Sequence, residues 1–562
     1  MPVPAKPTAI ETDKVEIGFD FDFKKLADTP LEQIPPNVIA LFKWSGIYHQ
    51  LQRGFFMIRV RVPGGLVAAD QLDALADLAD RFAQGQLCLT TRQTFQFHHV
   101  RKDDLWRVLE GLAAVGLDTK NACGDTNRNV VTCALQGVCP HEIGDVRPTL
   151  LTLANDGEIK DRQRNLPRKH KISVAGCDRA CGLTLINCQA YHPVRRLGSD
   201  GKDEIGYRFF SGGGLGARPY MAKVIFDWVP AGLVLDVARA AIEVYRVQGD
   251  RRSRALARLK ILVDRIGPHR FGEEVLAELR RRGVPGLDQI EPAATPAAAI
   301  QPSFLDGQAV IAQRQAGFVT LRIRIPRGEL DAGAARTLAR CARRFGDGSI
   351  MPTVRQNIQL RFVRAENLAA LTQELAAFHL DGCERAPDVV SCVGTTLCNL
   401  AVSDTPATAR KLVLALENDR ALADKVGALR IHLNGCPNSC THHWIGDIGL
   451  RGRRYQAAAG SEEGFSVWVG GSVEGPGHIG QMVTEVPVTA VEATVRRLLE
   501  IYLERRQDGE ETFGAFARRV GPEAIASQLG EITAPADPLH ARNLRLAPVF
   551  NDTVEEALRR GR

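Results

Sequence analysis

Apolar and polar positions near the start of the chain follow strand and helix periods in turn. Gly54–Gly65 alternates as a strand and stops at Pro-Gly-Gly. Apolar residues then recur at helical spacing over Ala68–Gln84, and Leu87–Val100 reads as one further strand. A second helical pattern covers Asp103–Leu117. This order predicts a β-α-β-α unit.

The same unit, which is of the ferredoxin-like type, returns in the second part of the chain. Gly317–Gly328 begins 263 positions after Gly54 and has the same strand pattern. Glycine-rich turns repeat at Phe209–Gly216 and Trp468–Gly475, where glycines would let the backbone approach a flat ligand closely. Because an internal repeat determines the architecture, we expect a duplicated chain with two halves related by a pseudo-twofold axis.

Eight of the 13 cysteines form two groups with identical steps of 6, 38 and 4 residues. The first tetrad is Cys133, Cys139, Cys177 and Cys181, and the second tetrad is Cys392, Cys398, Cys436 and Cys440. Four thiolates suit a cubane iron–sulfur cluster. Structural zinc sites usually show a tighter CxxC pair, and buried free cysteines can also pack as small hydrophobic residues.

Length and charge narrow the class of protein. A chain of 562 residues is too long for one core and should form several domains. The surplus of 72 basic over 65 acidic residues is mild and fits a solvated surface. The basic stretch Gly249–Lys260 reads as a helix and lacks interleaved aromatic residues, so we expect no nucleic-acid binding.

The start of the chain has no apolar signal segment, and no run approaches the length of a membrane span. We therefore expect a cytoplasmic protein without membrane contact, in which reduced thiols are available to metal. The chain also has no Rossmann or flavin-binding fingerprint, so an electron donor would be a separate protein.

The cysteine motifs carry a family resemblance. CVGTTLC (Cys392–Cys398) and NGCPNSC (Asn434–Cys440) resemble the cluster-binding signature of the sirohaem-dependent sulfite and nitrite reductases. The resemblance implies that the second tetrad holds a [4Fe–4S] cluster and that Cys440 also bridges to the sirohaem iron. It further implies an α+β fold of duplicated architecture, with two ferredoxin-like half-domains and two sirohaem/cluster-binding α/β domains.

We expect the following division of the chain. It comprises an N-terminal arm with little structure of its own (1–35), half-domain 1 (36–120), sirohaem/Fe–S-type domain 1 (121–290), a linker (291–302), half-domain 2 (303–382), sirohaem/[4Fe–4S] domain 2 (383–510) and a C-terminal tail (511–562).

Three basic motifs, TTRQTFQFH, NRNV and LPRKxK, look like the substrate-anion motifs of sulfite reductases. The resemblance assigns four cations to the anion pocket: Arg92, Arg128, Lys169 and Lys171. It places Arg168 beside a sirohaem carboxylate. It also suggests that part of Gly249–Lys260 borders the cofactor, and a solvated helix is the alternative for that stretch. Guanidinium groups hold oxyanions in a fixed geometry, and ammonium groups can also deliver protons. One active site would then draw on both halves of the chain.

The choice between sulfite and nitrite as the expected substrate depends mainly on one position in the sequence. Nitrite reductases of this family resemble a Lys-x-Asn pattern where this chain has Lys169-His170-Lys171. Two lysines suit the larger and more charged oxyanion, so we expect reduction of sulfite to sulfide in assimilatory sulfur metabolism. Ferredoxin-nitrite reductase is the alternative, because GTTLCNLA and GCPNSC look like its motifs. Ferredoxin or a flavoprotein would supply electrons.

Two further functions would use an iron–sulfur cluster but no sirohaem. They are an oxygenase of the cobalamin pathway and a non-catalytic iron–sulfur electron carrier. The Arg and Lys set argues against both. His442 and His443, which follow Cys440, are expected beside the cluster or on the surface.

The first tetrad departs from the family pattern, since the usual member has lost these ligands. Few residues of the second half match the cations that the resemblance assigns to the anion pocket. Arg355 and Arg430 remain, but Pro387 stands in the place of Arg128 and Ala428 in that of Lys169. We therefore expect no second catalytic site, and both a second cluster and packed free thiols remain open for these four cysteines.

Overall fold

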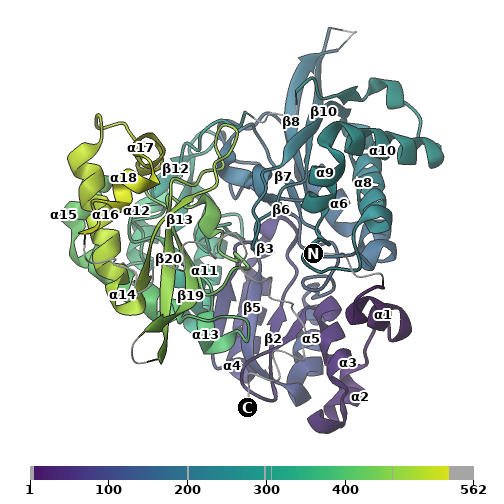
Figure 1. The fold of residues 1–562 in the computed structure, drawn as a ribbon, viewed down its shortest axis with the longest axis horizontal. Coiled ribbons are helices and arrows are strands. Elements are labelled where there is room, and N and C mark those ends of the chain that lie inside the picture. Colours follow the sequence, from purple (N-terminus) through teal and green to yellow (C-terminus); the bar gives the residue numbers. More distant parts are fainter. Residues whose placement is uncertain (1–5, 199–200, 296–298, 306, 458–459, 531–562) are drawn as a thin grey trace.

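The computed structural model describes residues 6–198, 201–295, 299–305, 307–457 and 460–530. The described part of the chain contains four sheets, two in each half (Figure 1). Each half has one sheet of the ferredoxin-like type and one mixed sheet that carries the cysteine loops. This is the duplicated α+β organisation that the repeat predicts. Among the described residues, no helix is both long and apolar enough to cross a membrane.

The two half-domain sheets exchange their edge strands. The first sheet has the order β1 (Ile47–His49), β2 (Phe55–Arg59), β5 (Phe95–Arg101), β4 (Gln86–Leu89) and β14 (Glu329–Asp331). The second has the order β12 (Val310–Ala312), β13 (Phe318–Ile323), β16 (Ile358–Arg364), β15 (Ser349–Pro352) and β3 (Val67–Ala68). Leu330 of the second half thus lies opposite Leu87, and Val67 of the first half lies opposite Ile350.

Two long helices lie next to the exchanged strands. They are α4 (Ala69–Phe82) and α11 (Ala332–Phe345), which pack against each other. Leu72 and Leu338 are fully buried in one apolar core that both half-domains share. Exposed ion pairs join the same helices, for example Arg336 with Asp77 and Asp80. The smaller helices α5 (Leu105–Ala114) and α12 (Leu368–Glu374) complete the two half-domains.

The stretch predicted as one strand over Leu87–Val100 is instead a hairpin of β4 and β5. The chain turns at Thr90–Thr94, where the Thr90 hydroxyl accepts the N–H groups of Arg92 and Thr94. The apolar positions before the turn (Leu87, Leu89) and after it (Phe95, Phe97) stay in the same alternating phase, so periodicity alone did not reveal it. The correction matters because it places Arg92 at the tip of a hairpin.

A glutamine at each hairpin turn joins the two halves. Gln93 and Gln356 both have left-handed backbone angles, with φ of +56° and +63°. The Nε2 atom of Gln93 donates to the Pro352 carbonyl (3.0 Å), and that of Gln356 donates to the Leu89 carbonyl (2.9 Å). Their Oε1 atoms accept the last N–H groups of two cysteine-bearing strands, one residue before the first cysteine of each tetrad.

The cysteine-bearing sheets have the same design in both halves. The first has the order β11 (Glu291–Pro292), β10 (Lys223–Pro230), β9 (Asp203–Ser211), β8 (Gln189–Leu197), β7 (Ile172–Val174) and β6 (Val131–Thr132). The second has the order β17 (Val389–Ser391), β18 (Ile431–Asn434), β19 (Ile448–Ala457), β20 (Gly460–Val469) and β21 (Gln481–Pro487). In each sheet the strands that precede the cysteines are parallel, so the cysteine loops leave from the same edge.

Helices cover these sheets and form a core with each of them. The first core contains α6 (Arg147–Asn155), α8 (Val234–Gln248), α9 (Leu259–Ile266) and α10 (Pro268–Arg281). The second contains α14 (Thr405–Asn418), α15 (Arg420–Val426), α16 (Val491–Arg505), α17 (Phe513–Val520) and α18 (Pro522–Ala526). Short α13 (Gly394–Leu397) lies within the second cysteine loop.

The repeated glycine-rich turns serve the protein backbone and not only a ligand. A Cβ atom on Gly213 would lie 2.4 Å from the Leu185 carbonyl oxygen, and one on Gly471 would lie 2.5 Å from that of Trp444. Both carbonyls belong to the segments that follow the tetrads. The turns are therefore glycine-rich because the cysteine loop passes directly over them in each half.

Three expectations about less regular segments are wrong. The expected arm carries α1 (Ala9–Glu16) and α2 (Phe23–Ala27), followed by α3 (Pro36–Leu41), and Phe23 is buried in the shared core. The described part of the expected tail, 511–530, forms α17 and α18 and buries Phe513 and Ile525. Within Gly249–Lys260 no helix forms before Leu259, where α9 begins. The surface strap expected beyond Ile532 lies outside the described residues.

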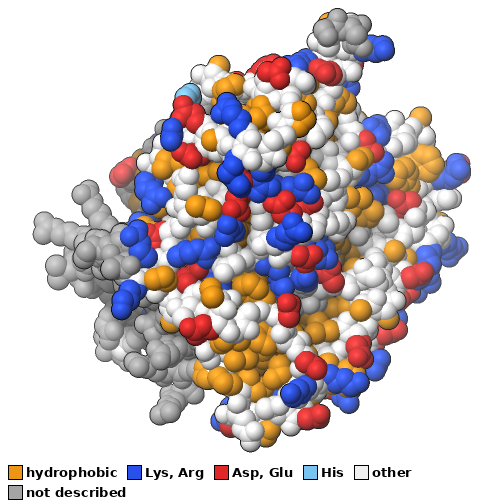
Figure 2. Space-filling model, turned by 90° about the vertical axis from the view of Figure 1, so that its right-hand side faces the viewer, with side chains coloured by type: hydrophobic (Ala, Val, Ile, Leu, Met, Phe, Trp, Pro, Cys, Tyr) orange, Lys and Arg blue, Asp and Glu red, His pale blue; other side chains and the backbone are white. Residues whose placement is uncertain are grey.

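Charged side chains of both signs share the surface. On the face seen in Figure 2, Lys and Arg are interspersed with Asp and Glu, with several basic side chains across the middle of the view.

The expected linker begins as β11, which pairs with β10, and its Gln301 pairs with Arg179.

Candidate active site

The second tetrad comes together at the ends of two parallel strands. Cys392 directly follows β17, and Cys436 closely follows β18. Cys398 ends α13, and Cys440 lies in the loop after β18 and is exposed. All four sulfurs lie close enough to influence one another electrostatically. The predicted convergence of these cysteines is therefore found.

Backbone N–H groups point at the sulfurs of this tetrad. The Gly435 N–H donates to the Cys392 sulfur at 3.2 Å. Three of the four cysteines also accept an N–H from the residue two positions later, namely Gly394, Leu400 and Asn438. Such N–H···S bonds stabilise thiolates and adjust the potential of a cluster. Burial raises the pKa of Cys398 to about 12, so without bound iron these groups are thiols.

The predicted anion-binding arginines lie in the first half and are held by backbone carbonyls. Arg92 donates to the Asn187 side-chain oxygen (3.0 Å) and to the carbonyls of Asn129 and Ile172. Arg128 donates to the Gly124 carbonyl through Nε and Nη2 (3.0 and 2.7 Å). These contacts orient both guanidinium groups and leave their charge unbalanced.

The two predicted lysines are half-buried beside these arginines. Among the described residues, the ammonium groups of Lys169 and Lys171 have no hydrogen-bond or ion-pair partner. Burial, followed by Arg168, lowers the pKa of Lys169 to about 7. Burial and then Arg92 lower the pKa of Lys171 well below its ordinary value. Both ammonium groups would therefore gain from a bound anion.

Arg168, expected beside a sirohaem carboxylate, makes an ion pair within the protein. Its Nη1 lies 3.1 Å from Oδ1 of buried Asp125, which Arg254 also contacts at 2.7 Å. Lys14 of α1 reaches the same carboxylate at 3.9 Å. The N-terminal helix thus helps to support the segment that carries the two lysines.

Three further cations, which the sequence analysis did not name individually, lie in the same region. Arg59 of β2 donates to the Cys123 sulfur, and Arg258 donates to the Cys188 sulfur. Lys260 is 4% exposed and donates to the carbonyls of Gly214 and Leu215 in the glycine-rich turn. Arg258 and Lys260 belong to the basic stretch Gly249–Lys260, for which the border of the cofactor and a solvated helix were both expected, whereas nothing in the sequence marked Arg59.

We call six of these residues the cation group: Arg59, Arg92, Arg128, Lys169, Lys171 and Arg258. Within the described part of the chain, none of them forms an ion pair with a carboxylate. Burial and then Arg128 lower the pKa of Arg92 to about 9, and its Nε, like that of Arg258, is buried without a partner. A buried group of like charges is costly unless an anion neutralises it.

The cation group lies next to the second tetrad. The Thr91 hydroxyl donates to the Cys440 carbonyl at 2.8 Å, and the Cys440 thiol lies within electrostatic range of Lys169. The imidazole ring of buried His442 also lies within electrostatic range of Lys171 and Arg92. One half therefore supplies the cysteines and the other supplies the cations. The chemistry fits a [4Fe–4S] cluster held by the second tetrad and a sirohaem whose carboxylates face the cations.

His442 and His443 are both buried, so the expectation of a surface position is wrong. Burial lowers the pKa of each well below its ordinary value, and both are neutral at physiological pH. His443 packs against Trp444 with ring centroids 4.7 Å apart. These histidines are neighbours of the cluster loop that help to pack it.

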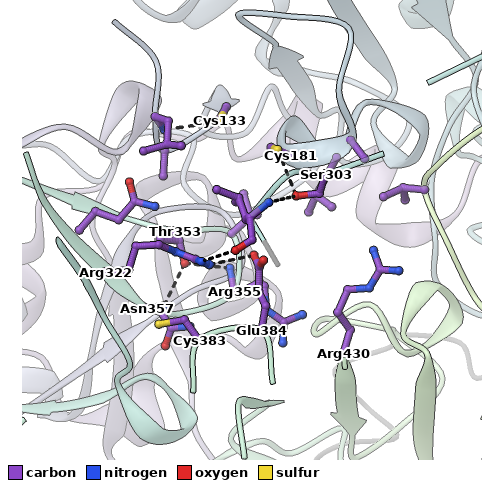
Figure 3. A pocket seen from close by; sticks show the side chains of 18 of the residues that line it. Cys133, Cys181, Ser303, Arg322, Thr353, Arg355, Asn357, Cys383, Glu384 and Arg430 are labelled. Carbon is purple, nitrogen blue, oxygen red and sulfur yellow. Dashed lines mark hydrogen bonds and ion pairs between the residues drawn. The ribbon is translucent and has the colours of Figure 1, made fainter. Parts of the chain in front are cut away.

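The pseudo-symmetric position in the molecule is a small pocket of about 90 Å³. Figure 3 shows Cys133 and Cys181 toward the top of this pocket, with Arg322 and Glu384 below them. The pocket brings together two cysteines of the first tetrad, Cys133 and Cys181, and cations of the second half, as the repeat predicts.

The cations of this pocket are neutralised. Arg322 pairs with Glu384 (3.2 Å), Arg355 with Asp388 (3.2 Å) and Arg430 with Asp447 (3.1 Å). A cavity of about 90 Å³ is far smaller than a tetrapyrrole requires. Both observations agree with the expectation that the second half has no anion site of its own.

Comparison with known proteins identifies the family. Residues 123–282 and 385–535 match the family described as "Nitrite and sulphite reductase 4Fe-4S domain". Residues 48–115 and 311–378 match the family described as "Nitrite/Sulfite reductase ferredoxin-like half domain". Together these matches cover most of the chain and both of its repeats.

Individual relatives span nearly the whole length. The chain is 31% identical to the chloroplastic ferredoxin–nitrite reductase of Zea mays, over 90% of this chain and 91% of that protein. It is 29% identical to the assimilatory ferredoxin-dependent nitrite reductase of Haloferax mediterranei, over 90% of each. It is also 29% identical to sulfite reductase [ferredoxin] 1 of Mycolicibacterium paratuberculosis, over 86% of this chain and 89% of that one.

A solved structure shares the fold. The Mycobacterium tuberculosis NirA protein superimposes with a TM-score of 0.81 at 25% identity, covering 92% of this chain and 98% of that one. The architecture predicted from the repeat is thereby confirmed, as are the [4Fe–4S] cluster and sirohaem as cofactors. The chain belongs to the sirohaem- and [4Fe–4S]-dependent nitrite and sulfite reductase family.

Proposed function

We propose that this enzyme reduces sulfite to sulfide in six one-electron steps. The observation that carries the proposal is the cation group beside Cys440, which has no carboxylate partner among the described residues. Four of its members, Arg92, Arg128, Lys169 and Lys171, would bind the oxyanion. Two lysines and two arginines match the charge of a sulfite dianion better than that of a nitrite monoanion.

The side chains have different tasks in this proposal. Arg92 and Arg128 are fixed by backbone carbonyls, so their guanidinium groups orient the anion. Lys169 has a pKa of about 7, which lets it donate a proton near neutral pH and be protonated again. Each oxygen that leaves sulfite takes up two protons and departs as water. The cluster and the sirohaem, when bound, supply the electrons and the iron that binds the substrate.

Cofactor attachment would use the remaining groups. The second tetrad would hold the cluster, with Cys440 shared between the cluster and the sirohaem iron. Arg168, which is committed to Asp125 through Nη1, would reach a sirohaem carboxylate at most through its other nitrogens. Arg59 and Arg258 are better placed for that role, because their charges have no carboxylate partner in the described chain.

We infer that the electron donor is ferredoxin, which the names of the most similar relatives include. A separate flavoprotein is the alternative donor. None of the 13 cysteines, all of which lie in the described part of the chain, forms a disulfide, which fits a reducing compartment such as the cytoplasm.

Reduction of nitrite to ammonia is the second candidate, because several of the relatives are named nitrite reductases. Steady-state kinetics with reduced ferredoxin and each anion would separate the two. We expect kcat/KM to be larger for sulfite. A larger kcat/KM for nitrite would overturn the sulfite proposal and leave the family assignment intact.

The variant Lys171→Asn tests why sulfite would be preferred. We expect it to lower kcat/KM for sulfite by about 10²-fold, the usual effect of losing one group that stabilises the transition state. Nitrite, with less charge to balance, should lose much less. Lys411→Asn, on the exposed face of α14, is the matched control and should leave both rates unchanged. Equal losses for both anions would show that Lys171 does not discriminate between them.

A further inference from the structure

The first tetrad has no part in the proposed function, yet its four sulfurs meet. Cys133 directly follows β6, and Cys177 closely follows the parallel strand β7. The thiol of Cys133 contacts that of Cys181, and the thiol of Cys139 contacts that of Cys177. Four packed cysteines with no common task would not need to converge from two loops that are 38 residues apart.

The hydrogen bonds to these sulfurs repeat those of the second tetrad. The Leu135 N–H donates to the Cys133 sulfur at 3.4 Å. Cys139 and Cys177 accept the N–H groups of His141 and Arg179. In both tetrads the same three cysteines therefore accept an N–H from the residue two positions later. Thiols that only pack as hydrophobic residues have no use for this arrangement.

The surroundings of the first tetrad differ from those of the second. Cys133, Cys139 and Cys177 are 4–5% exposed, and two of them pack in one cluster with Leu135, Leu305 and Ile311. This apolar enclosure shields the sulfurs from water. In the described residues, no group of three or more Cys, His, Asp or Glu side chains is arranged to hold a single metal ion, and this holds for both tetrads alike.

We propose that the first tetrad binds a second [4Fe–4S] cluster, and that this cluster has no sirohaem beside it. The neighbouring pocket of about 90 Å³ is too small for a tetrapyrrole, and its arginines are already paired with carboxylates. The inference goes beyond the proposed function and does not depend on which anion the enzyme reduces.

The test counts cofactors in the anaerobically purified full-length protein. Iron, acid-labile sulfide and extractable sirohaem are measured for the same sample. Two clusters and one haem predict about nine irons and about eight sulfides per sirohaem. About five irons and about four sulfides per sirohaem would overturn the proposal, and so would about one zinc ion per chain. Neither result touches the proposed function, which needs only the sirohaem and the second tetrad.

A double variant locates the additional iron. Cys139→Ser with Cys177→Ser should lose about four irons and about four sulfides while keeping its sirohaem. Cys341→Ser, which changes a buried cysteine of α11 outside both tetrads, is the matched control and should keep all of them. Iron that stays unchanged in the double variant would contradict the assignment. If the double variant does not fold, the wild-type count still decides.

Thiol counting excludes the remaining explanation. The unfolded, metal-stripped protein is alkylated with and without prior reduction. A cluster site predicts that all 13 cysteines react without reduction. Four cysteines that react only after reduction would show two disulfides in the first tetrad, and would overturn the proposal.

Discussion

At the scale of single residues, the cation group combines two opposing demands. The anion pocket needs positive charge that no carboxylate cancels, and the folded chain is destabilised by that same charge. In the second half the charge is neutralised instead. Its Arg355 forms an ion pair with Asp388 and a hydrogen bond with His432. The two halves thus differ in which arginines and lysines have carboxylate partners, and the proposed anion site lies where they have none.

A pH dependence of stability follows for Lys169. Its pKa is about 7 in the folded chain and 10.5 when unperturbed, so the unfolded state binds more protons between these values. The free energy of unfolding of the cofactor-free protein should therefore rise with pH across this window, by at most about 1.4 kcal/mol per pH unit from this lysine. Urea titrations at a series of pH values measure the slope.

The control for this effect is the same series with Lys169→Met. The variant should be more stable than the wild type at pH 7 and should show a shallower rise, whereas Lys411→Met should behave like the wild type. A slope that Lys169→Met leaves unchanged would mean that the ammonium group is already balanced in the folded protein.

Residue-level prediction worked where a motif surrounds the side chain. Arg92, Arg128, Lys169 and Lys171 were identified from their motifs, and the structure brings the four side chains together, with Lys169 within electrostatic range of Cys440. Their role in anion binding stays a prediction. Arg258 was not named individually, because the basic stretch Gly249–Lys260 that contains it fits a solvated helix as well as the border of the cofactor. Burial of a lone arginine leaves no mark in the sequence, since its partners come from distant strands.

At the scale of elements, the repeated unit predicted the two helices that pack on each half-domain sheet, α4 and α5 with α11 and α12, and the strands β2 and β13, but not α3 or the short edge strands. It did not predict the turn at Thr90–Thr94, because the apolar positions before it (Leu87, Leu89) and after it (Phe95, Phe97) stay in the same alternating phase and no Gly or Pro marks the turn. It also could not show that β14 pairs with β4, since a strand of three residues has too little pattern to specify its partner. Short elements are positioned by tertiary contacts, and those contacts cross between the halves.

The hairpin glutamines provide a test at this scale. Gln356 has a positive φ that suits glycine, but its side chain makes two buried hydrogen bonds, to the Leu89 carbonyl and from the Ser391 N–H. Losing both should outweigh the relief of backbone strain, so Gln356→Gly should lower the free energy of unfolding by about 1–3 kcal/mol. Denaturant unfolding of the variant measures this change.

Gln84 is the matched control for backbone strain alone. It has a φ of +55° at the end of α4 and an exposed side chain. Gln84→Gly should therefore stabilise the protein slightly. If Gln356→Gly were as stabilising as Gln84→Gly, the cross-half hydrogen bonds would contribute nothing.

At the scale of the whole molecule, the halves depend on each other. They exchange β3 and β14, share one apolar core, and assemble one active site from both sequences. A protease site inserted after Thr295 should therefore give two fragments that remain together after cleavage. Size-exclusion chromatography of the cleaved protein should show one species with the mass of the intact chain. Fragments that separate without denaturant would show that the strand exchange is not needed.

The exchanged strands also say something about the origin of the chain. A protein that consisted of one half alone would lack one edge strand of its own sheet. Its own short strand, which now pairs with the sheet of the other half, would have no partner. Two identical copies would satisfy each other, since each would supply the strand that its partner lacks. The present fold therefore has the strand exchange of a symmetric homodimer within one chain. Because both halves belong to one chain, each can carry its own side chains at equivalent positions, so that the cations lack carboxylate partners in one half and have them in the other.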